Sequence, residues 1–145
     1  CKDFVVDPDH QIPEARAHGA DAILLMAQIL EPAAIERALG LCRALGMEGL
    51  VEVHDEGELA RVLAETSARI VGINERDLGT LAIDLDRPRR LAARAREAGR
   101  LVVAESGLRE RAHVAAIEGE VDAILVGTAL SRAADPRAAL VALGF

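Results

Sequence analysis

The sequence predicts an α/β fold in which a parallel sheet is covered by helices. Short, nearly continuous apolar runs alternate along the chain with amphipathic stretches, as expected of buried strands and the helices that cover them. The phrase Asp-Ala-Ile-Leu occurs at 21–24 and again at 122–125, each time after an expected helix and at the start of an expected strand. This repetition indicates that the chain is built from similar strand–helix units.

The expected strands are short runs of apolar residues, and polar residues or glycines follow most of them. In order along the chain they cover 1–4 (the tail of a strand), 22–26, 49–53, 70–73, 101–104 and 123–126. The pattern therefore predicts five complete strands and the end of a sixth.

The expected helices are defined mainly by their ends. Asp7-Pro8 signals a helix entry, and the first helix is expected over 11–18, ending at Gly19, with Pro13 limiting how early it begins. Asp135 is a good N-cap and Pro136 suits the first helical position, so a last helix begins there. The other expected helices cover 32–45, 56–65, 88–98, 110–118 and a short stretch at 129–132, and a polar loop covers 74–86.

Length, charge and composition exclude several classes of protein. The 145 residues fit one domain, residues 1–145, and a formal net charge of −7 with only two Phe, no Tyr and no Trp argues against a nucleic-acid partner. The longest apolar run, 22–27, is too short to cross a bilayer, so no membrane association is expected. Cys1 and Cys42 form neither a disulfide framework nor a metal cluster, and a cytoplasmic location is expected.

Two architectures fit a parallel sheet of this kind. One is an open, doubly wound sheet, and the other is a piece of a TIM (β/α)₈ barrel. A whole barrel typically needs about 250 residues. The chain also begins, at Cys1, inside what looks like a functional motif. If the fold is a barrel, we expect a partial one that lacks the first two to three strands.

Residues that can carry chemistry follow the ends of successive strands. In open α/β sheets and in barrels alike, functional sites gather at the carboxyl ends of the strands. The candidates at these ends are Lys2, Glu52, Asn74, Arg76, Glu105, Ser106, Gly107, Gly127 and Thr128. This recurrence is the main functional signal in the pattern alone.

Glu52 is the most informative candidate because it interrupts an apolar strand. It shares one strand face with Leu50, and a lone carboxylate on a buried face is costly unless it is paired or hydrogen-bonded. A catalytic role and a structural ion pair both remain open for it. Without further context, Lys2 is more simply a solvated charge. His54 lies just past a strand end, where it either contacts substrate or is a loop or capping histidine.

Two glycine-containing segments suggest a phosphate site. Glu105-Ser106-Gly107 places an acid, a hydroxyl and an accessible backbone N–H at the rim of the sheet. Gly127-Thr128 follows the final strand and opens a short helical stretch, where backbone N–H groups can bind phosphate. The alternative for each segment is an ordinary tight turn.

Taken together, the motifs resemble those of the indole-3-glycerol phosphate synthase family, a family of (β/α)₈ barrels in tryptophan biosynthesis. The resemblance covers essentially the whole chain, and its strength lies in six motifs in the same order and spacing. They are Lys-Asp-Phe-Val-Val-Asp-Pro at 2–8, Glu-Ala-Arg-Ala-His-Gly-Ala-Asp-Ala-Ile-Leu-Leu at 14–25, Leu-Val-Glu-Val-His at 50–54, Gly-Ile-Asn-Glu-Arg-Asp-Leu at 72–78, Glu-Ser-Gly at 105–107 and Leu-Val-Gly-Thr-Ala-Leu at 125–130.

The resemblance implies a cofactor-free ring closure. A small phosphorylated substrate, 1-(2-carboxyphenylamino)-1-deoxyribulose 5-phosphate, would give indole-3-glycerol phosphate, carbon dioxide and water. By match to the family's motifs, Lys2 is the general acid and Glu52 is the acid–base carboxylate. Asn74, Arg76 and Glu105 match positions that line the substrate and hold the catalytic groups. The phosphate would be held by Ser106, Gly107, Gly127 and Thr128.

The chain also departs from the family pattern. Thr128 stands where the family usually has Ser, which preserves the hydroxyl. The first two strands and most of the third are absent, leaving two open sheet edges that self-association or a partner would cover. We therefore expect the isolated chain to be inactive or nearly so. Two alternatives are another phosphate-binding barrel enzyme (an isomerase or a lyase) and a non-catalytic barrel fragment.

Overall fold

The computed structural model of the chain describes residues 1–74 and 87–145. Its centre is a five-stranded parallel sheet in which the strands lie side by side in chain order, from β1 to β5. The strands are β1 (Ala22–Met26), β2 (Glu48–Val53), β3 (Ile70–Asn74), β4 (Leu101–Glu105) and β5 (Ala123–Leu125). The predicted alternation of strands and helices is confirmed, and parallel strands in unbroken order are the arrangement of a (β/α) barrel.

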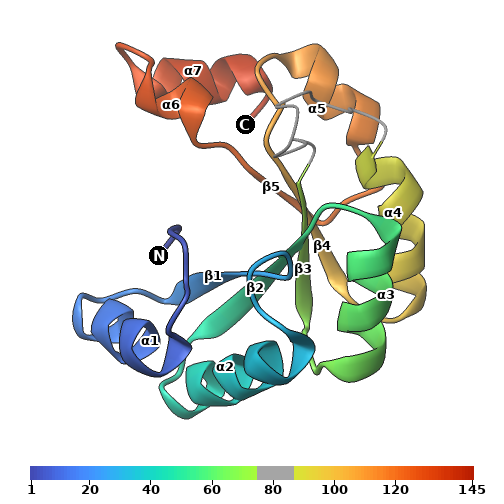
Figure 1. Ribbon diagram of the computed structural model, residues 1–145. Coiled ribbons are helices and arrows are strands. Elements are labelled where there is room, and N and C mark those ends of the chain that lie inside the picture. The colour runs from blue at the N-terminus through green and yellow to red at the C-terminus, as the bar shows by residue number, and fades with distance from the viewer. Residues whose placement is uncertain (75–86) are drawn as a thin grey trace.

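Helices surround the outer side of this sheet (Figure 1). They form an arc that leaves one side of the molecule open, so the chain folds as a partial (β/α) barrel. None of the helices in the described residues is long and apolar enough to span a membrane. The helices are α1 (Pro8–Ala17), α2 (Pro32–Ala44), α3 (Glu56–Glu65), α4 (Arg87–Glu97), α5 (Arg111–Ile117), α6 (Thr128–Ser131) and α7 (Pro136–Leu143).

The main hydrophobic core lies between the sheet and the helices. Alternate strand residues point outward into it, and Val51 and Val53 of β2 are completely buried there. Ile35 of α2 and Leu59 of α3 are buried in the same core. Each such side chain contributes about 1.5–3 kcal/mol relative to exposure. The residues between them in sequence, such as Glu52, therefore face the inside of the barrel.

The first helix begins earlier than the sequence predicted. It starts at Pro8, directly after Asp7, and Pro13 lies inside it. The amide of Gln11 donates to the carbonyl of Asp7, which closes the first turn. The expectation that Pro13 limits the start was wrong, because a proline within a helix removes one backbone donor and here does not prevent the turn around it.

The expected strand at 1–4 is reduced to a single residue. The N-terminal ammonium of Cys1 donates to the carbonyl of Ala22 over 2.6 Å, and the amide of Leu24 donates to the carbonyl of Cys1 over 3.0 Å. Cys1 therefore continues the sheet beside β1, and the next residue stands at the carboxyl end of this edge. Of the polar loop expected at 74–86, Asn74 ends β3, and 75–86 lies outside the described residues.

Apolar side chains near both chain ends are exposed. Phe4 and Val6 near the start of the chain and Val141 and Phe145 near its end are each about 60–70% exposed. Both chain ends lie on the open side of the arc in Figure 1. Val102 of β4 belongs to the main core, whereas Ala104 belongs to a second, smaller cluster with Leu108 and Ile117.

Candidate active site

Three adjacent strands bring three of the predicted residues together on the inner face of the sheet. Glu52 lies near the end of β2, and Asn74 and Glu105 are paired in register at the ends of β3 and β4. Glu52 and Glu105 are 1% exposed, and Asn74 is 7% exposed. Burying two carboxyl groups lowers the stability of the fold, and buried ionisable groups of this kind are common at functional sites.

A glycine on the strand between the two glutamates makes room for them. Gly72 of β3 is in register with Glu52 on one side and with Val103 on the other. A Cβ atom at Gly72 would collide with Oε1 of Glu105 and would lie 3.0 Å from its Cδ. The carboxyl group of Glu105 therefore lies across β3, over the position that a larger side chain would fill.

Burial and the neighbouring carboxylate of Glu52 raise the pKa of Glu105 to about 8, and Lys2 opposes this shift. In the described residues, none of the carboxylate oxygens of Glu52 and Glu105 accepts a hydrogen bond from another side chain or from the backbone. Two carboxyl groups can hydrogen-bond each other only when one of them holds a proton. Near neutral pH Glu105 therefore retains its proton.

Lys2 reaches this pair from the opposite edge of the sheet. Its Nζ lies 4.0 Å from Oε2 of Glu105, and its side chain is 53% exposed. Lys2 is the only lysine in the sequence. A half-exposed ammonium beside a buried carboxyl pair has access both to solvent and to a bound substrate, which a general acid needs.

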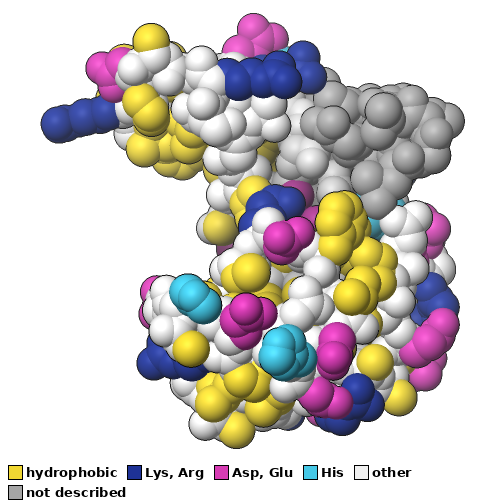
Figure 2. All heavy atoms as spheres, turned by 60° about the vertical axis from the view of Figure 1, so that its left-hand side comes forward, with side chains coloured by type: hydrophobic (Ala, Val, Ile, Leu, Met, Phe, Trp, Pro, Cys, Tyr) yellow, Lys and Arg dark blue, Asp and Glu magenta, His cyan; other side chains and the backbone are white. Residues whose placement is uncertain are grey.

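A cavity of about 600 Å³ joins these groups to the two glycine segments. Figure 2 shows the molecule drawn in on its open side, between the part that holds α6 and α7 and the part that holds α1 and α2. A volume of this size suits a small organic ligand. The predicted site residues that line the cavity are Lys2, Glu52, Asn74, Ser106, Gly107, Gly127 and Thr128.

The turn after β4 has an unusual backbone. Ser106 has a φ of 68° and Gly107 a φ of 73°, so two successive residues adopt the left-handed region. Ser106 is the only non-glycine residue with positive φ in the described part of the chain. Such strain is common where backbone groups are aimed at a ligand. Gly127 and Thr128 begin α6 across the cavity, and both are exposed.

One predicted residue is not placed, and no metal site is found. Arg76 lies outside the described residues. In residues 1–74 and 87–145, no group of three or more His, Cys, Asp or Glu side chains is arranged to hold a metal ion.

The burial of His54 between two glutamates was not predicted from the sequence. This residue is 8% exposed, and its Nε2 lies 3.3 Å from Oε1 of Glu52 while its Nδ1 lies 3.3 Å from Oε2 of Glu58. The spacing is visible in the sequence, because His54 is two residues after Glu52 and four residues before Glu58, but this spacing does not give the direction of the ring. His54 does lie in the connection between β2 and α3, as expected of a loop residue, but its side chain is buried between two carboxylates.

The fold and the position of this cavity define the chain as part of a (β/α)-barrel protein with its site at the carboxyl ends of the strands. Solved structures show the same fold. A 3-keto-L-gulonate-6-phosphate decarboxylase from Vibrio cholerae matches 99% of this chain and 68% of its own with a TM-score of 0.69 at 19% identity. A tryptophan synthase from M. tuberculosis matches 95% of this chain and 53% of its own with a TM-score of 0.67, also at 19% identity.

Sequence comparison then identifies the family. Residues 1–143 match the model of the family described as Indole-3-glycerol phosphate synthase, and the chain belongs to that family. It is 50% identical over 136 residues to Indole-3-glycerol phosphate synthase 2 of Streptomyces coelicolor, covering 93% of this chain and 52% of the relative. It is 46% identical over 143 residues to Indole-3-glycerol phosphate synthase of Mycobacterium avium, covering 98% and 52%. The chain thus spans about half the length of the curated relatives it matches.

Proposed function

We propose that this chain carries the acid–base and phosphate-binding part of an indole-3-glycerol phosphate synthase, a carboxy-lyase of tryptophan biosynthesis. The substrate would be 1-(2-carboxyphenylamino)-1-deoxyribulose 5-phosphate. The observation that carries the proposal is that Lys2 and Glu52 line the same cavity as Gly107 and Gly127. An acid, a carboxylate and a candidate phosphate site therefore face one space of suitable size.

The reaction needs acid and base at successive steps. The ring carbon that bears the carboxylate attacks the ketone carbon, and the ketone oxygen takes a proton from the ammonium of Lys2 to become a hydroxyl. Loss of carbon dioxide returns the electron pair of the broken bond to the ring. Glu52 then takes a proton from the neighbouring carbon and passes it to the hydroxyl, which leaves as water, and Lys2 regains its proton from solvent. Glu105, which retains its proton, and Asn74 orient the reacting groups.

The phosphate would bind at the opposite side of the cavity. The hydroxyls of Ser106 and Thr128 can donate to phosphate oxygens, and the backbone N–H groups of Gly107 and Gly127 can approach closely because no side chain blocks them. Arg76 would add a positive charge to the substrate-binding set, as the family's motif implies. The proposal calls for no cofactor.

Location and partners form part of the same proposal. Cys1 and Cys42 are both free thiols, which fits a reducing cytoplasm. The exposed apolar residues near the chain ends, such as Val141 and Phe145, would suit a partner segment or a second copy that covers them. Neither a nucleic acid nor a membrane is proposed as a partner.

The test is product formation from synthetic substrate. We expect the 145-residue chain alone to form little or no indole-3-glycerol phosphate, because the arc leaves one side of the cavity open. Combined with the N-terminal half of the Streptomyces coelicolor relative, it should turn over at roughly 1–10 per second, an ordinary enzymatic rate. Light scattering establishes whether the two pieces assemble. An assembled complex that makes no product would contradict the proposal.

Lys2 offers a second test that needs no turnover. Because it is the only lysine, an amine-reactive label other than at the N-terminus must attach there. The substrate should slow this labelling, as measured by mass spectrometry, while labelling of the Cys1 amine serves as the internal control. Equal protection of both amines would argue against binding in the cavity.

A further inference from the structure

His54 stands between two buried carboxylates at the end of β2. Its Nε2 faces Oε1 of Glu52 at 3.3 Å, and its Nδ1 faces Oε2 of Glu58 at the same distance. Both glutamates are buried, and the ring itself is 8% exposed. A carboxylate oxygen is only an acceptor, so each ring nitrogen suits its neighbour when it carries a proton.

Glu58 is fixed independently of the histidine ring. Its Oε2 accepts a hydrogen bond of 2.7 Å from the backbone N–H of His54, and its own amide donates to Oδ1 of Asp55 over 2.8 Å. Asp55 is the N-cap of α3, so these bonds form a variant of the capping box. Glu58 is therefore a rigid acceptor that can orient the imidazole, as carboxylates commonly orient histidines in functional sites.

On its other side, His54 meets the carboxylate that lines the cavity. Glu52 accepts no hydrogen bond from other described residues, so the imidazole is a close polar neighbour to it. The other ionisable groups near Glu52 are Glu105 from β4 and, beyond it, Lys2. An N–H at Nε2 favours negative charge on Glu52 and so leaves the proton with Glu105.

We propose that His54, held by Glu58, is a positioning residue that fixes the carboxylate of Glu52 at the cavity and keeps it unprotonated. The histidine does not touch the cavity itself and acts through Glu52. The part of this inference that concerns catalysis rests on the proposed function, and the part that concerns protonation does not.

The experiment compares substitutions that separate the ring from the helix cap. His54→Leu removes both ring nitrogens but keeps the backbone N–H that Glu58 accepts from. His54→Gln places an amide donor where Nε2 stood. His113→Leu is the matched control, because His113 also pairs with a glutamate, Glu110, at 3.1 Å but lies away from the cavity on α5.

The first readout is carbon-13 NMR of the glutamate carboxyl groups in the 145-residue chain across pH 4 to 9. We expect Glu105 alone to carry the titration step near pH 8 in the unsubstituted chain. In His54→Leu the step should be shared between Glu52 and Glu105, and His54→Gln should restore much of the original pattern. Spectra of His54→Leu that match those of His113→Leu would overturn the proposal.

The second readout is kinetic and uses the chain combined with the N-terminal half of the relative. His54→Leu should lower kcat about 10–100-fold with KM nearly unchanged, the usual scale for residues that orient a catalytic group. The kcat of His54→Gln should be about tenfold higher than that of His54→Leu. Absence of turnover before any substitution would count against the proposed function only, because the NMR result tests the positioning role by itself.

Discussion

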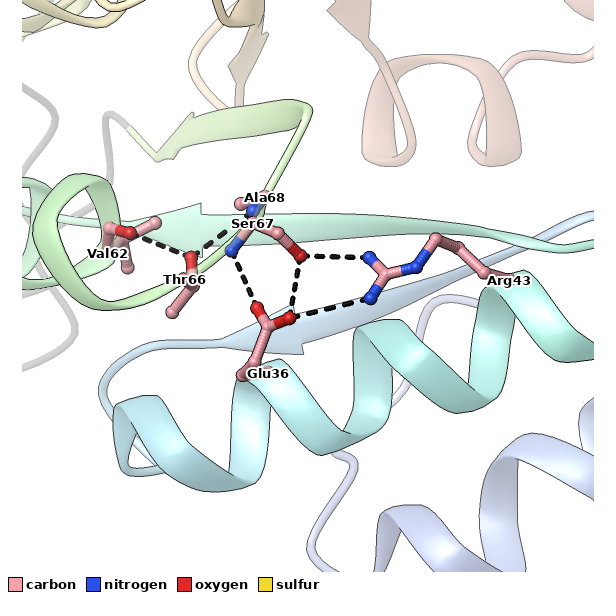
Figure 3. A network of polar contacts seen from close by, with 6 residues as sticks. All are labelled: Glu36, Arg43, Val62, Thr66, Ser67 and Ala68. Carbon is pink, nitrogen blue, oxygen red and sulfur yellow. Dashed lines mark hydrogen bonds and ion pairs between the residues drawn. The ribbon is translucent and has the colours of Figure 1, made fainter.

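Glu36 and Glu105 carry the same side chain in opposite settings. Glu36 of α2 accepts hydrogen bonds from the backbone N–H of Ser67 at 2.6 Å and from its hydroxyl at 2.8 Å, and Arg43 lies 3.4 Å away (Figure 3). These interactions lower the pKa of Glu36, and the hydrogen bond from the backbone N–H of Ser67 has the largest effect. Glu105 is buried and accepts no hydrogen bond from the described residues, and its pKa rises to about 8.

The two glutamates make their contacts at opposite ends of the sheet, and we assign a stabilising role to one end and a chemical role to the other. Ser67 lies in the segment that leads from α3 into the amino end of β3, where Thr66 also hydrogen-bonds Val62 and Ala68 (Figure 3). A satisfied carboxylate there ties α2 to the sheet. At the carboxyl ends of the two strands that flank β3, the unsatisfied carboxyl groups of Glu52 (β2) and Glu105 (β4) cost stability, and Glu105 retains its proton near neutral pH. Barrels commonly divide these tasks between their two faces.

The largest expected effect comes from exchanging carboxylates for amides in the two settings. Glu52→Gln in the chain combined with the N-terminal half of the relative should lower kcat about 10²–10⁴-fold, because it removes the carboxylate to which we assign the acid–base role. Glu36→Gln should leave kcat within about twofold and should lower stability by about 1 kcal/mol through weakened hydrogen bonds. Steady-state kinetics and urea unfolding measure the two effects. If Glu36→Gln also abolished turnover, the separation of tasks would be wrong.

The second expected effect is on the pH dependence of stability. The folded-state pKa of Glu105, about 8, lies above its ordinary value of 4.5, so the folded chain binds more protons between these values. The contribution of Glu105 is therefore complete below about pH 4.5 and is lost as pH rises through 8, with a slope of at most about 1.4 kcal/mol per pH unit. Glu105→Gln should flatten this slope in urea unfolding measured from pH 5 to 9. A slope unchanged by the substitution would show that Glu105 does not hold the proton.

The smallest expected effect concerns two glycines, one in each setting. Gly72→Ala puts a methyl group against Glu105 and should destabilise the chain by about 1–3 kcal/mol. It should also separate Glu105 from Glu52 and lower the pKa of Glu105. Gly40→Ala is the control, because its nearest neighbour would be Arg43 at 3.8 Å and helical alanine is favoured over glycine by about 0.5–1 kcal/mol. Thermal unfolding compares the two, and equal stability changes would mean that Gly72 has no spacing role.

Most of the fold could be predicted from the sequence, because apolar runs and helix caps are local features of the chain. The five complete strands expected from the apolar runs all formed, although the strand end expected at 1–4 did not. Asp135 caps α7 by accepting from the amides of Arg137 and Ala138, as its place before Pro136 predicted. The early start of α1 was missed because a proline inside a helix reads as a boundary unless the cost of one lost donor is weighed against the rest of the helix.

The candidate site was predictable in its members but not in its internal contacts. Strand ends placed Glu52, Asn74 and Glu105 at one edge, because parallel strands share a direction. The contact between the two glutamates depends on register across three strands and on the missing side chain at Gly72, and sequence spacing shows neither. The role of His54 required the direction of its ring, which the backbone pattern leaves undetermined.

The strand order has a consequence for how such a protein can be divided and rebuilt. In residues 1–74 and 87–145, each strand of the sheet is hydrogen-bonded only to the strands next to it in chain order. A break in the chain between two strand–helix units separates only one pair of neighbouring strands, and the strand pairs on either side of the break are kept. Swapping one unit for that of a relative, or rejoining separately made pieces, thus requires only that two strand edges find each other, and engineered recombinants of this chain have natural seams at each helix-to-strand junction.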